Sequence, residues 1–473
     1  MKLRLIVFAR PLIWAGMLLT FAGFSLECVL AQQQDSVAYG AVPTQASTSS
    51  PNTGAPVTIT LQDALTRARV NSPQFQAAVA DFGLAHEDKA QARANLLPNV
   101  TANSQFIYTE GNGTATGRFI ANNGVHEYIA QGNAHQSLAV ADFAELRKTQ
   151  AAEAVAKAKT EIVARGLVVT VVQSYYGLLV AQRKYATAQR ADQEGQRFLT
   201  ITQQLEKGGE VAHSDVIKAQ IQYQQVHRDL EETQLAMNKA RLDVAVLIFP
   251  NFNQDFTVVD DLSTPEPLPS FAEAQGMAAQ RNPDLQAAIA GLREAGNEVN
   301  VARAGYLPAL SFDYFYGIDA PQLAVSGSPV PVSPEFPATV GVVRNLGFAA
   351  TASLSVPIWN WGATHSKVKQ AVIRRQLAQV ELNATQRQIL ANLRGFYNEA
   401  QTSRSELQSL SRSAELAAES LRLTTLRYKA GEATVLEVVD AQSTLTQARN
   451  LYDDGQARYR LALANLQTVT GGF

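Results

Sequence analysis

The chain has a single cysteine in 473 residues, Cys28, and it lies inside a segment with the features of a secretory signal. Residues 1–31 combine a basic end, the apolar stretch Leu12–Phe24 and a small-residue cleavage site ending at Ala31, which predicts a signal peptide. Lipidation of Cys28 is the disfavoured alternative, because Glu27 stands where a lipobox has a small residue. Cleavage after Ala31 leaves a mature chain without cysteine, which excludes disulfide bonds and thiol chemistry.

An excess of charge of either sign is also missing. The signal holds three of the 40 basic and one of the 42 acidic residues, so the mature chain has 37 and 41, a net charge of −4. Nucleic-acid binding usually requires a basic face, and we expect no nucleic-acid partner. Residues 32–57, rich in Gln, Ser, Thr, Gly and Pro, predict a flexible N-terminal arm.

Long hydrophobic runs and catalytic motifs are absent too. After the signal there is no continuous apolar run of about 18 residues, so we expect no transmembrane helix and assign any membrane crossing to strands. The six histidines form no metal-ligand pattern, and phosphate-loop, dinucleotide and nucleophile-elbow motifs are missing. We expect a protein that is not an enzyme and that holds no metal or cofactor.

Proline is absent from two long stretches, between Pro98 and Pro250 and after Pro357. Both stretches are rich in Ala, Gln, Leu, Glu, Lys and Arg, a composition that favours helix. The pattern predicts one helix over 143–206 and another over 363–429. At 1.5 Å per residue each helix is about 95–100 Å long.

Each long helix is predicted to end at a glycine and to be followed by a second helix. Gly208 and Gly209 end the first and Gly431 ends the second, as glycines commonly do at helix C-termini. Helices over 214–248 and 434–469 then run back. The sequence therefore predicts two antiparallel helical hairpins with glycine tips.

Apolar and polar residues alternate with a period of two before each hairpin. Val100–Tyr108, Leu310–Tyr316 and Ala352–Ile358 show this alternation, and a weaker run spans Ser137–Phe143. Four strands of about ten residues, each apolar on one face, are typical of a transmembrane β-barrel.

The chain is internally duplicated. Leu61–Val100 aligns without a gap with Phe271–Leu310, 210 positions later, and 13 of the 40 positions are identical. A second match, at an offset of 222, aligns the sequences of the two hairpin tips. We expect two repeats, over 58–260 and 261–473, each with two strands and one long hairpin.

Glycine-rich residues 111–133 and proline-rich residues 318–348 are predicted to form loops outside the cell. Four strands cannot close a barrel, and each unpaired backbone group of an open edge in lipid costs several kcal/mol. We therefore expect oligomerisation. Three copies give twelve strands, although the periodicity does not choose three copies over four.

The chain resembles the TolC-like family of outer-membrane efflux proteins from about Val57 to its C-terminus. The resemblance rests on SLSVPIWNWG (353–362), RYKAGEATVLEVVDAQ (427–442), and the paired segments SPQFQAA with NPDLQAA and ARANLLP with ARAGYLP. It implies an α+β membrane protein, in which a trimeric 12-stranded transmembrane β-barrel with four strands per chain is continuous with a long α-helical periplasmic barrel.

The family resemblance also implies a function. The chain would be a passive exit duct in the outer membrane of a Gram-negative cell, extending into the periplasm. A homotrimer would dock on a periplasmic adaptor protein and an inner-membrane pump, and would conduct small molecules or a secreted polypeptide to the exterior. The exported substrate and the class of pump, proton-driven or ATP-driven, stay open.

Residue roles follow by similarity at the second tip. Glu437 and Asp440 match two carboxylates that narrow the family's periplasmic entrance and select ions. Three residues apart on a helix, they share one face, and in a trimer they would present six negative charges that favour cations. The alternative is a solvated helical face near a surface turn.

Closure of that entrance is also assigned by similarity. Tyr428 and Asp215 match positions that hold neighbouring hairpins together by hydrogen bonds, and Ser214 stands where the family often has another hydroxyl. The arginine of this latch is missing, because Ala433 occupies its position. Arg427 is a candidate substitute.

Two further sets of residues have expected roles. The tip turns at Gly208, Gly209 and Gly431 are candidates for adaptor docking. Trp359 and Trp361 are amphipathic residues between a strand and a long helix, which suits anchoring at the interface with outer-membrane lipid rather than transport chemistry.

Two alternatives from other classes are weighed against the exit duct. A periplasmic adaptor of the membrane-fusion type also contains helical hairpins, but it has one hairpin within β-rich domains. A general porin is dominated by strand, whereas helix dominates here.

Overall fold

The computed structural model describes residues 57–108, 126–263, 267–325, 328–329 and 342–471. The predicted signal peptide, Cys28 and almost all of the predicted arm lie outside the described residues. So do parts of the two predicted loops. From Val57 onward the chain forms one unit.

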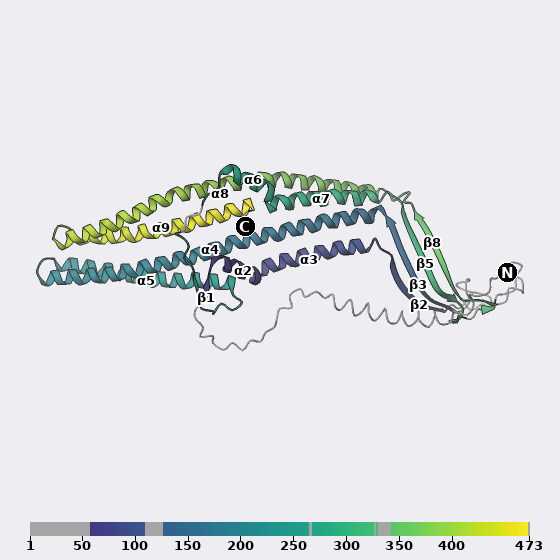
Figure 1. Cartoon of the computed structure of the whole chain (residues 1–473), viewed down its shortest axis with the longest axis horizontal. Helices are drawn as coiled ribbons and strands as arrows, with labels where there is room; N and C mark the ends of the chain where they lie inside the picture. Colours follow the sequence, from purple (N-terminus) through teal and green to yellow (C-terminus); the bar gives the residue numbers. More distant parts are fainter. Residues whose placement is uncertain (1–56, 109–125, 264–266, 326–327, 330–341, 472–473) are drawn as a thin grey trace, which may run out of the picture. The chain divides into compact units, whose positions relative to one another are not determined.

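Two helical hairpins account for most of the described residues. The first pairs α4 (Val140–Lys207) with α5 (His213–Ile248), and the second pairs α8 (Ala363–Lys429) with α9 (Val435–Thr470). Figure 1 shows the two tips at the same end. The predicted helices are confirmed to within three residues at each end. At 68 and 67 residues, α4 and α8 are each about 100 Å long.

Four shorter helices pack on the two long hairpins, and two of them contact the return helices. They are α2 (Leu61–Asn71), α3 (Pro73–Ala94), α6 (Phe271–Arg281) and α7 (Pro283–Ala304). Helix α3 contacts α4, and α7 contacts both α4 and α8. The bounds of α2 and α3 recur in α6 and α7 at the offset of 210. The prediction of one hairpin per repeat was therefore incomplete, because each repeat has these two helices as well.

The starts of these four helices follow from local chemistry. Thr60 and Ser270 cap α2 and α6, each in a capping box with the acidic residue three positions later. Pro73 and Pro283 occupy the first turns of α3 and α7, where a missing N–H costs nothing. The patterns T-x-x-D and S-x-x-E were the available sequence signals.

The largest core lies around the middle of α4. This helix is long and apolar enough in composition to cross a membrane, contrary to our expectation, and it is the one such helix among the described residues. Its Val171, Tyr175 and Leu178 are buried against residues of α2 and α5. The core also includes the parallel strand pair β1 (Val57–Ile59) and β4 (Phe256–Val258). The apolar segment of α4 is thus a core element of the helical part.

The strands form a four-stranded antiparallel sheet in the order β2-β3-β5-β8. Its members are β2 (Asn99–Tyr108), β3 (His126–Ala139), β5 (Ala309–Ala320) and β8 (Leu346–Ser355). Within the described residues, β2 and β8 each pair on one side only. A separate two-residue pair joins β6 (Ser328–Pro329) to β7 (Val342–Val343).

Two strand predictions were displaced along the chain. The weak run at Ser137–Phe143 belongs mostly to α4, because Asp142 accepts bonds from Ser137 Oγ and from the Ala139 amide and so starts the helix at Val140. Strand β3 instead starts at His126, inside a predicted loop. Strand β8 ends at Ser355 rather than Ile358.

The register places apolar and polar side chains on opposite faces of the sheet. Along one face, Val100, Ala134, Tyr314 and Ala350 are opposite one another from strand to strand. The next row on the other face is Asn99, His135, Asp313 and Thr351, and it includes a 2.7 Å hydrogen bond between the His135 ring and the Asp313 carboxylate. The apolar face is exposed: Phe348 is 72% and Leu354 is 65% exposed.

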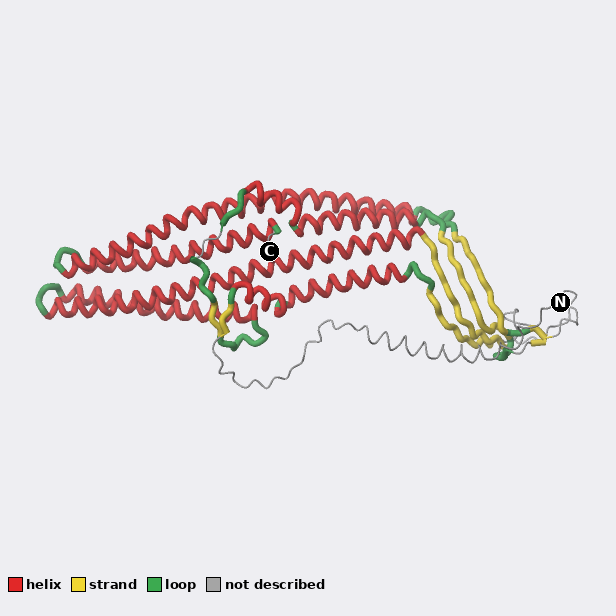
Figure 2. The backbone as a smooth tube through the Cα atoms, in the orientation of Figure 1, coloured by secondary structure: helices red, strands yellow, loops and turns green. Residues whose placement is uncertain are grey.

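Each strand of the sheet connects directly to a long helix or to a helix that packs on one. Helices α3 and α7 lead into β2 and β5, and strands β3 and β8 lead into α4 and α8. Figure 2 shows the sheet at one end of these helices and the hairpin tips at the other. The candidate site lies at the tips.

Candidate functional site: the hairpin tips

Both long helices end in the same turn. Gly209 and Gly431 have φ of +78°, the left-handed conformation that glycine adopts without strain. The Glu210 amide donates to Leu205 O over 2.9 Å, and the Glu432 amide donates to Arg427 O over 2.8 Å. Both turns are Schellman motifs. Gly208 has φ of −77°, so it does not need to be a glycine.

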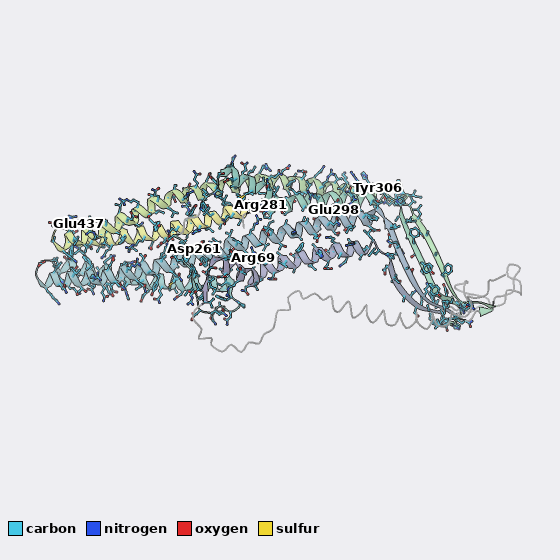
Figure 3. The ribbon with its side chains drawn as sticks, viewed as in Figure 1. Arg69, Asp261, Arg281, Glu298, Tyr306 and Glu437 are labelled. Carbon is cyan, nitrogen blue, oxygen red and sulfur yellow. The ribbon has the colours of Figure 1, made fainter. Side chains whose placement is uncertain are left out.

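The second tip is held by a complete capping box. Thr434 Oγ1 accepts from the Glu437 amide at 3.3 Å, and the Glu437 carboxylate accepts from the Thr434 amide at 3.0 Å. These bonds with Thr434 hold the pKa of Glu437 below its usual value, and Arg427 lowers it further. Figure 3 labels Glu437 at the end of this hairpin. The pattern T-x-x-E was the sequence signal for Thr434, which our prediction missed.

Arg427 braces the same tip from α8. Its Nη2 donates to Glu432 O at 3.0 Å, and its Nη1 lies 3.5 Å from the Glu437 carboxylate. Both contacts are within the second hairpin. The role of Arg427 as a substitute for the latch arginine stays a prediction.

The first tip starts its return helix differently. Ala212, at the N-cap of α5, has no side-chain oxygen to cap the helix. Asp215 forms an ion pair of 3.1 Å with Lys218, one turn further along α5. His213 lies 2.6 Å from the Glu206 carboxylate, and Ser214 is exposed.

Tyr428 joins the two hairpins within one chain. Its hydroxyl donates to Thr202 Oγ1 on α4 at 3.3 Å, and its ring packs 5.1 Å from that of Phe198. Asp215 accepts a bond from Lys218 of its own helix. Nothing in the sequence pattern distinguishes Phe198 and Thr202 from other residues of α4.

The aromatic pair is part of a cluster that we call the tip cluster. It contains buried residues from all four hairpin helices: Phe198, Ala219, Ala417, Leu421, Tyr428, Val435, Val438, Ala441 and Leu445. Tyr428 is only 5% exposed and Val438 is fully buried. The contact between hairpins at the tips is therefore mainly apolar.

Asp440 lies on a cleft of about 840 Å³ that we call the acidic groove. Helices α4, α5 and α9 line it, and its other carboxylates are Glu194 and Asp229. The remaining polar lining is mostly amide and hydroxyl: Gln222, Gln225, Gln442, Ser443, Thr446, Gln447 and Asn450. Glu437 does not line the groove, so the two predicted gate carboxylates have different surroundings.

Trp359 and Trp361 lie far from the tips, in the segment between β8 and α8. They are 75% and 90% exposed, and their rings meet edge to face at 5.8 Å. Trp361 and Gly362 have φ of 54° and 81°. This turn directs two aromatic side chains outward where the sheet meets the helices.

Comparisons with known proteins agree with this architecture. The family model described as "Outer membrane efflux protein" matches residues 64–248 and 275–472. The chain is 24% identical over 414 residues to the outer membrane protein TolC of Escherichia coli, covering 86% of this chain and 80% of TolC. It is 23% identical over 423 residues to the alkaline protease secretion protein AprF of Pseudomonas aeruginosa, covering 87% and 84%.

Solved structures give the same result for the fold. The outer-membrane channel OprN superimposes with a TM-score of 0.74 over 87% of this chain and 90% of that chain, at 18% identity. At that identity the likeness concerns the fold alone.

Proposed function

The chain belongs to the outer membrane efflux protein family, and we propose that three copies of it assemble into a passive exit duct. It is an outer-membrane protein that serves efflux or secretion, as its relatives TolC and AprF do. The family is one of channels rather than enzymes. The copy number, the lumen residues and the docking partners are the parts that we propose.

A twelve-stranded barrel is supported by the two faces and two edges of the sheet, and this is the observation on which the proposal rests. The apolar face is exposed within one chain, which suits lipid, and the opposite face is polar, which suits a water-filled lumen. Strands β2 and β8 each need a further partner, since unpaired backbone in lipid is costly. Pairing β2 of one copy with β8 of the next closes a ring.

The helical tunnel is supported by the same order of elements. The helices α3 and α8 flank the helical part on the sides where β2 and β8 flank the sheet, so one copy-to-copy junction extends through both. Helices of about 100 Å reach far into the periplasm from the membrane. Trp359 and Trp361 mark the membrane interface between the two parts.

For the entrance we propose that Asp440 and Glu437 give the duct its cation preference and that Tyr428 holds it narrow. Asp440 borders an acidic groove, and its carboxylate is exposed. Tyr428 bridges two hairpins that must separate for the tip to widen. Asp215 and Ser214 remain candidates for contacts between copies, since both lie at the first tip.

We assign the energy source and the docking contacts to other proteins. The chain holds no catalytic motif, so a periplasmic adaptor and an inner-membrane pump are the expected partners. Among the described residues, the glycine turns at both tips lie furthest from the sheet. The exposed apolar face of the sheet argues against a periplasmic adaptor identity for this chain.

Fractionation and single-channel recording test the proposal together. We expect the mature protein in outer-membrane fractions, with a mass of three chains in detergent and stepwise conductance in planar bilayers. Recovery from the soluble periplasm alone, or a purified protein that forms no pores, would contradict it.

A further inference from the structure

Arg183 lies on α4 between the largest core and the tip cluster. Its guanidinium has five N–H donors, and each of them has an acceptor. Nε and Nη2 donate to the two carboxylate oxygens of Asp260 at 2.7 and 2.8 Å. Nη2 also donates to Ser263 Oγ at 3.2 Å, and Nη1 donates to the Asp453 carboxylate at 3.1 Å and to Gln456 Oε1. We call these five residues the Arg183 cluster.

The Arg183 cluster joins three segments of the chain. Arg183 belongs to the first hairpin, and Asp453 and Gln456 belong to α9 of the second. Asp260 and Ser263 belong to the segment 259–263, which lies between β4 and α6 where the two repeats meet. Asp453 and Gln456 are only 8% and 6% exposed. The cluster is therefore a largely buried polar connection between the two hairpins.

The segment 259–263 is itself held on the largest core. The buried Tyr175 donates from its hydroxyl to Val259 O at 2.7 Å, and Arg460 of α9 donates to Asp261 O at 2.8 Å. Figure 3 labels Asp261 between the hairpin tips and the sheet. Arg183 therefore binds both the second hairpin and a segment that the core already fixes.

Between the core and the tip cluster, α4 buries only small side chains. From Val180 to Phe198, its buried residues are Thr187, Ala188 and Gly195. The acidic groove of about 840 Å³ opens beside the same stretch of α4. The Arg183 cluster lies at the end of this stretch that is nearer the sheet. It is the first strong polar connection that separating hairpins would meet on the way from the tips.

We propose that Arg183 is a positioning residue of the entrance, which stops the separation of the two hairpins at its own level along α4. The proposal rests on the proposed function, in which the hairpins separate at the tips, and adds the residue that sets how far the separation extends. The movable arm of α4 then runs from position 183 to position 207, a difference of 24 residues, and is about 36 Å long.

The physical reason is the charge of Asp453. Its side chain is 11% exposed, and burial raises the pKa of its carboxyl while Arg183 opposes that rise. Separation beyond Arg183 would leave this carboxylate without its cation, and an uncompensated buried charge is strongly destabilising. The tip cluster is joined by apolar contacts and by the bond between Tyr428 and Thr202, which are easier to break one at a time.

A double-mutant cycle on the full-length mature protein in detergent tests the proposal. Tyr428→Ala frees the tips, Arg183→Gln removes the stop, and hydrogen exchange is measured for α4 and α9 amides on the two sides of Arg183. Thr202, the partner of Tyr428, lies 19 positions from Arg183 (202 minus 183), about 28 Å along α4. Substitutions so far apart normally have additive effects.

We expect a non-additive result on the sheet side of Arg183. Tyr428→Ala alone should accelerate exchange only on the tip side, and Arg183→Gln alone should change the sheet side little, because the tips still hold the hairpins together. Both changes together should accelerate exchange on the sheet side about tenfold more than the product of the single effects. A purely local structural role of Arg183 would give the same effect with or without Tyr428.

Lys184→Gln is the matched control. Lys184 is the next residue of α4, and its 2.7 Å ion pair with Asp454 is more exposed than that of Arg183 with Asp453. Combined with Tyr428→Ala, it should leave exchange on the sheet side as it is in Tyr428→Ala alone. Arg183→Lys should give a smaller coupling than Arg183→Gln, because lysine keeps the charge but supplies three donors instead of five.

Additive effects of Tyr428→Ala and Arg183→Gln overturn the proposal. So does an equal coupling for Lys184→Gln, and so does a Tyr428→Ala variant without faster exchange on the tip side. If Arg183→Gln does not assemble, Asp260→Asn takes its place, because that side chain is 42% exposed, and additivity there counts equally against the proposal.

Pore conductance is recorded on the same samples. Failure of the wild type to conduct contradicts the exit duct and leaves the exchange result to decide the role of Arg183. A conducting wild type with additive exchange effects contradicts the role of Arg183 alone.

Discussion

The two hairpin tips stop their long helices in the same way and start their return helices in different ways. Gly209 and Gly431 are equivalent at the offset of 222, and both close a Schellman motif. Three positions further on, Ala212 in the first tip corresponds to Thr434 in the second. The first has no side-chain cap and the second has a full capping box.

The residues before the turn differ as well. Tyr428, buried against the first hairpin, corresponds to Glu206, which pairs with His213 within its own tip. The gate candidate Asp440 corresponds to Lys218, which is bound to Asp215. The comparison indicates that the backbone reversal is common to both copies. A buried tyrosine before the turn and a carboxylate at the position of Asp440 occur in the second copy alone.

The largest loss of local stability is expected at Tyr428, which is buried in the second tip. Tyr428→Ala empties a site in the tip cluster and should cost about 3–5 kcal/mol of local stability. Faster hydrogen exchange in α8 and α9 near the tip, with higher pore conductance, is the expected result. Tyr428→Phe removes only the bond to Thr202 and should cost about 1 kcal/mol.

Glu206→Ala in the first tip is the matched control for this prediction. Its side chain makes a partly exposed hydrogen bond with His213 of its own tip, so exchange in α8 and α9 should not change. Equal responses to Tyr428→Ala and Glu206→Ala would refute the idea that the second tip alone joins the hairpins.

The shared turn predicts equal costs in both copies. Gly209→Ala and Gly431→Ala force an L-residue into the left-handed region and should each cost about 1–2 kcal/mol in local stability. Gly208→Ala should be nearly neutral, because position 208 has ordinary helical φ and its equivalent is Ala430. Hydrogen exchange of the amides in each turn measures the three variants. A large loss of local stability in Gly208→Ala would contradict the assignment of Gly209 as the glycine that this turn requires.

Exchanging the cap residues should make the starts of the two return helices more similar in stability. Thr434→Ala is expected to destabilise the start of α9 by about 1 kcal/mol, and Ala212→Thr to stabilise α5 by a similar or smaller amount. Exchange rates of the amides in the first turn of each return helix report both changes. An Ala212→Thr variant without slower exchange would show that another contact already satisfies that helix end.

Lowering the pH should weaken the same capping box at the start of α9. Because the folded pKa of Glu437 is lowered, its stabilising contribution is present above its usual value of 4.5 and is lost as the pH falls through the folded pKa. Protection of the α9 start should therefore fade below pH 4.5 in the wild type. The Thr434→Ala variant should show less of this fading.

Substitutions of the two gate carboxylates should change stability least. They should nevertheless change ion conduction clearly. Asp440→Asn removes three of the six proposed lumen carboxylates and should lower cation selectivity by about half. Glu437→Gln should lower it less, because Thr434 and Arg427 already engage that carboxylate. Reversal potentials in a salt gradient measure both.

Lys218→Asp extends the comparison to the first tip. It gives that copy the charge of Asp440, and cation selectivity should rise. If Asp440→Ala combined with Glu437→Ala leaves cation selectivity unchanged, neither carboxylate contributes to ion selection at the entrance.

The helices could be predicted closely because their signals are local. Two stretches lack proline, one between Pro98 and Pro250 and one after Pro357. Together with the glycines at 209 and 431, they located α4 and α8 to within three residues. The four shorter helices were not predicted, although Thr60 and Ser270 opened recognisable capping boxes.

The strands were harder because their limits depend on partners. Strand β8 ends at Ser355, where its partner β5 begins at Ala309, although the apolar alternation continues to Ile358. Strand β3 has polar residues on much of its length, and its pairing with both β2 and β5 determines where it lies.

The sequence by itself determined the duplication, the long hairpins with glycine tips and the family, because these depend on composition, spacing and local backbone preference. Only the tertiary structure decided which residues of the two hairpins meet at the tips, as Tyr428 meets Thr202. This contact joins residues 226 positions apart, and its partners follow from how the helices pack rather than from neighbouring sequence.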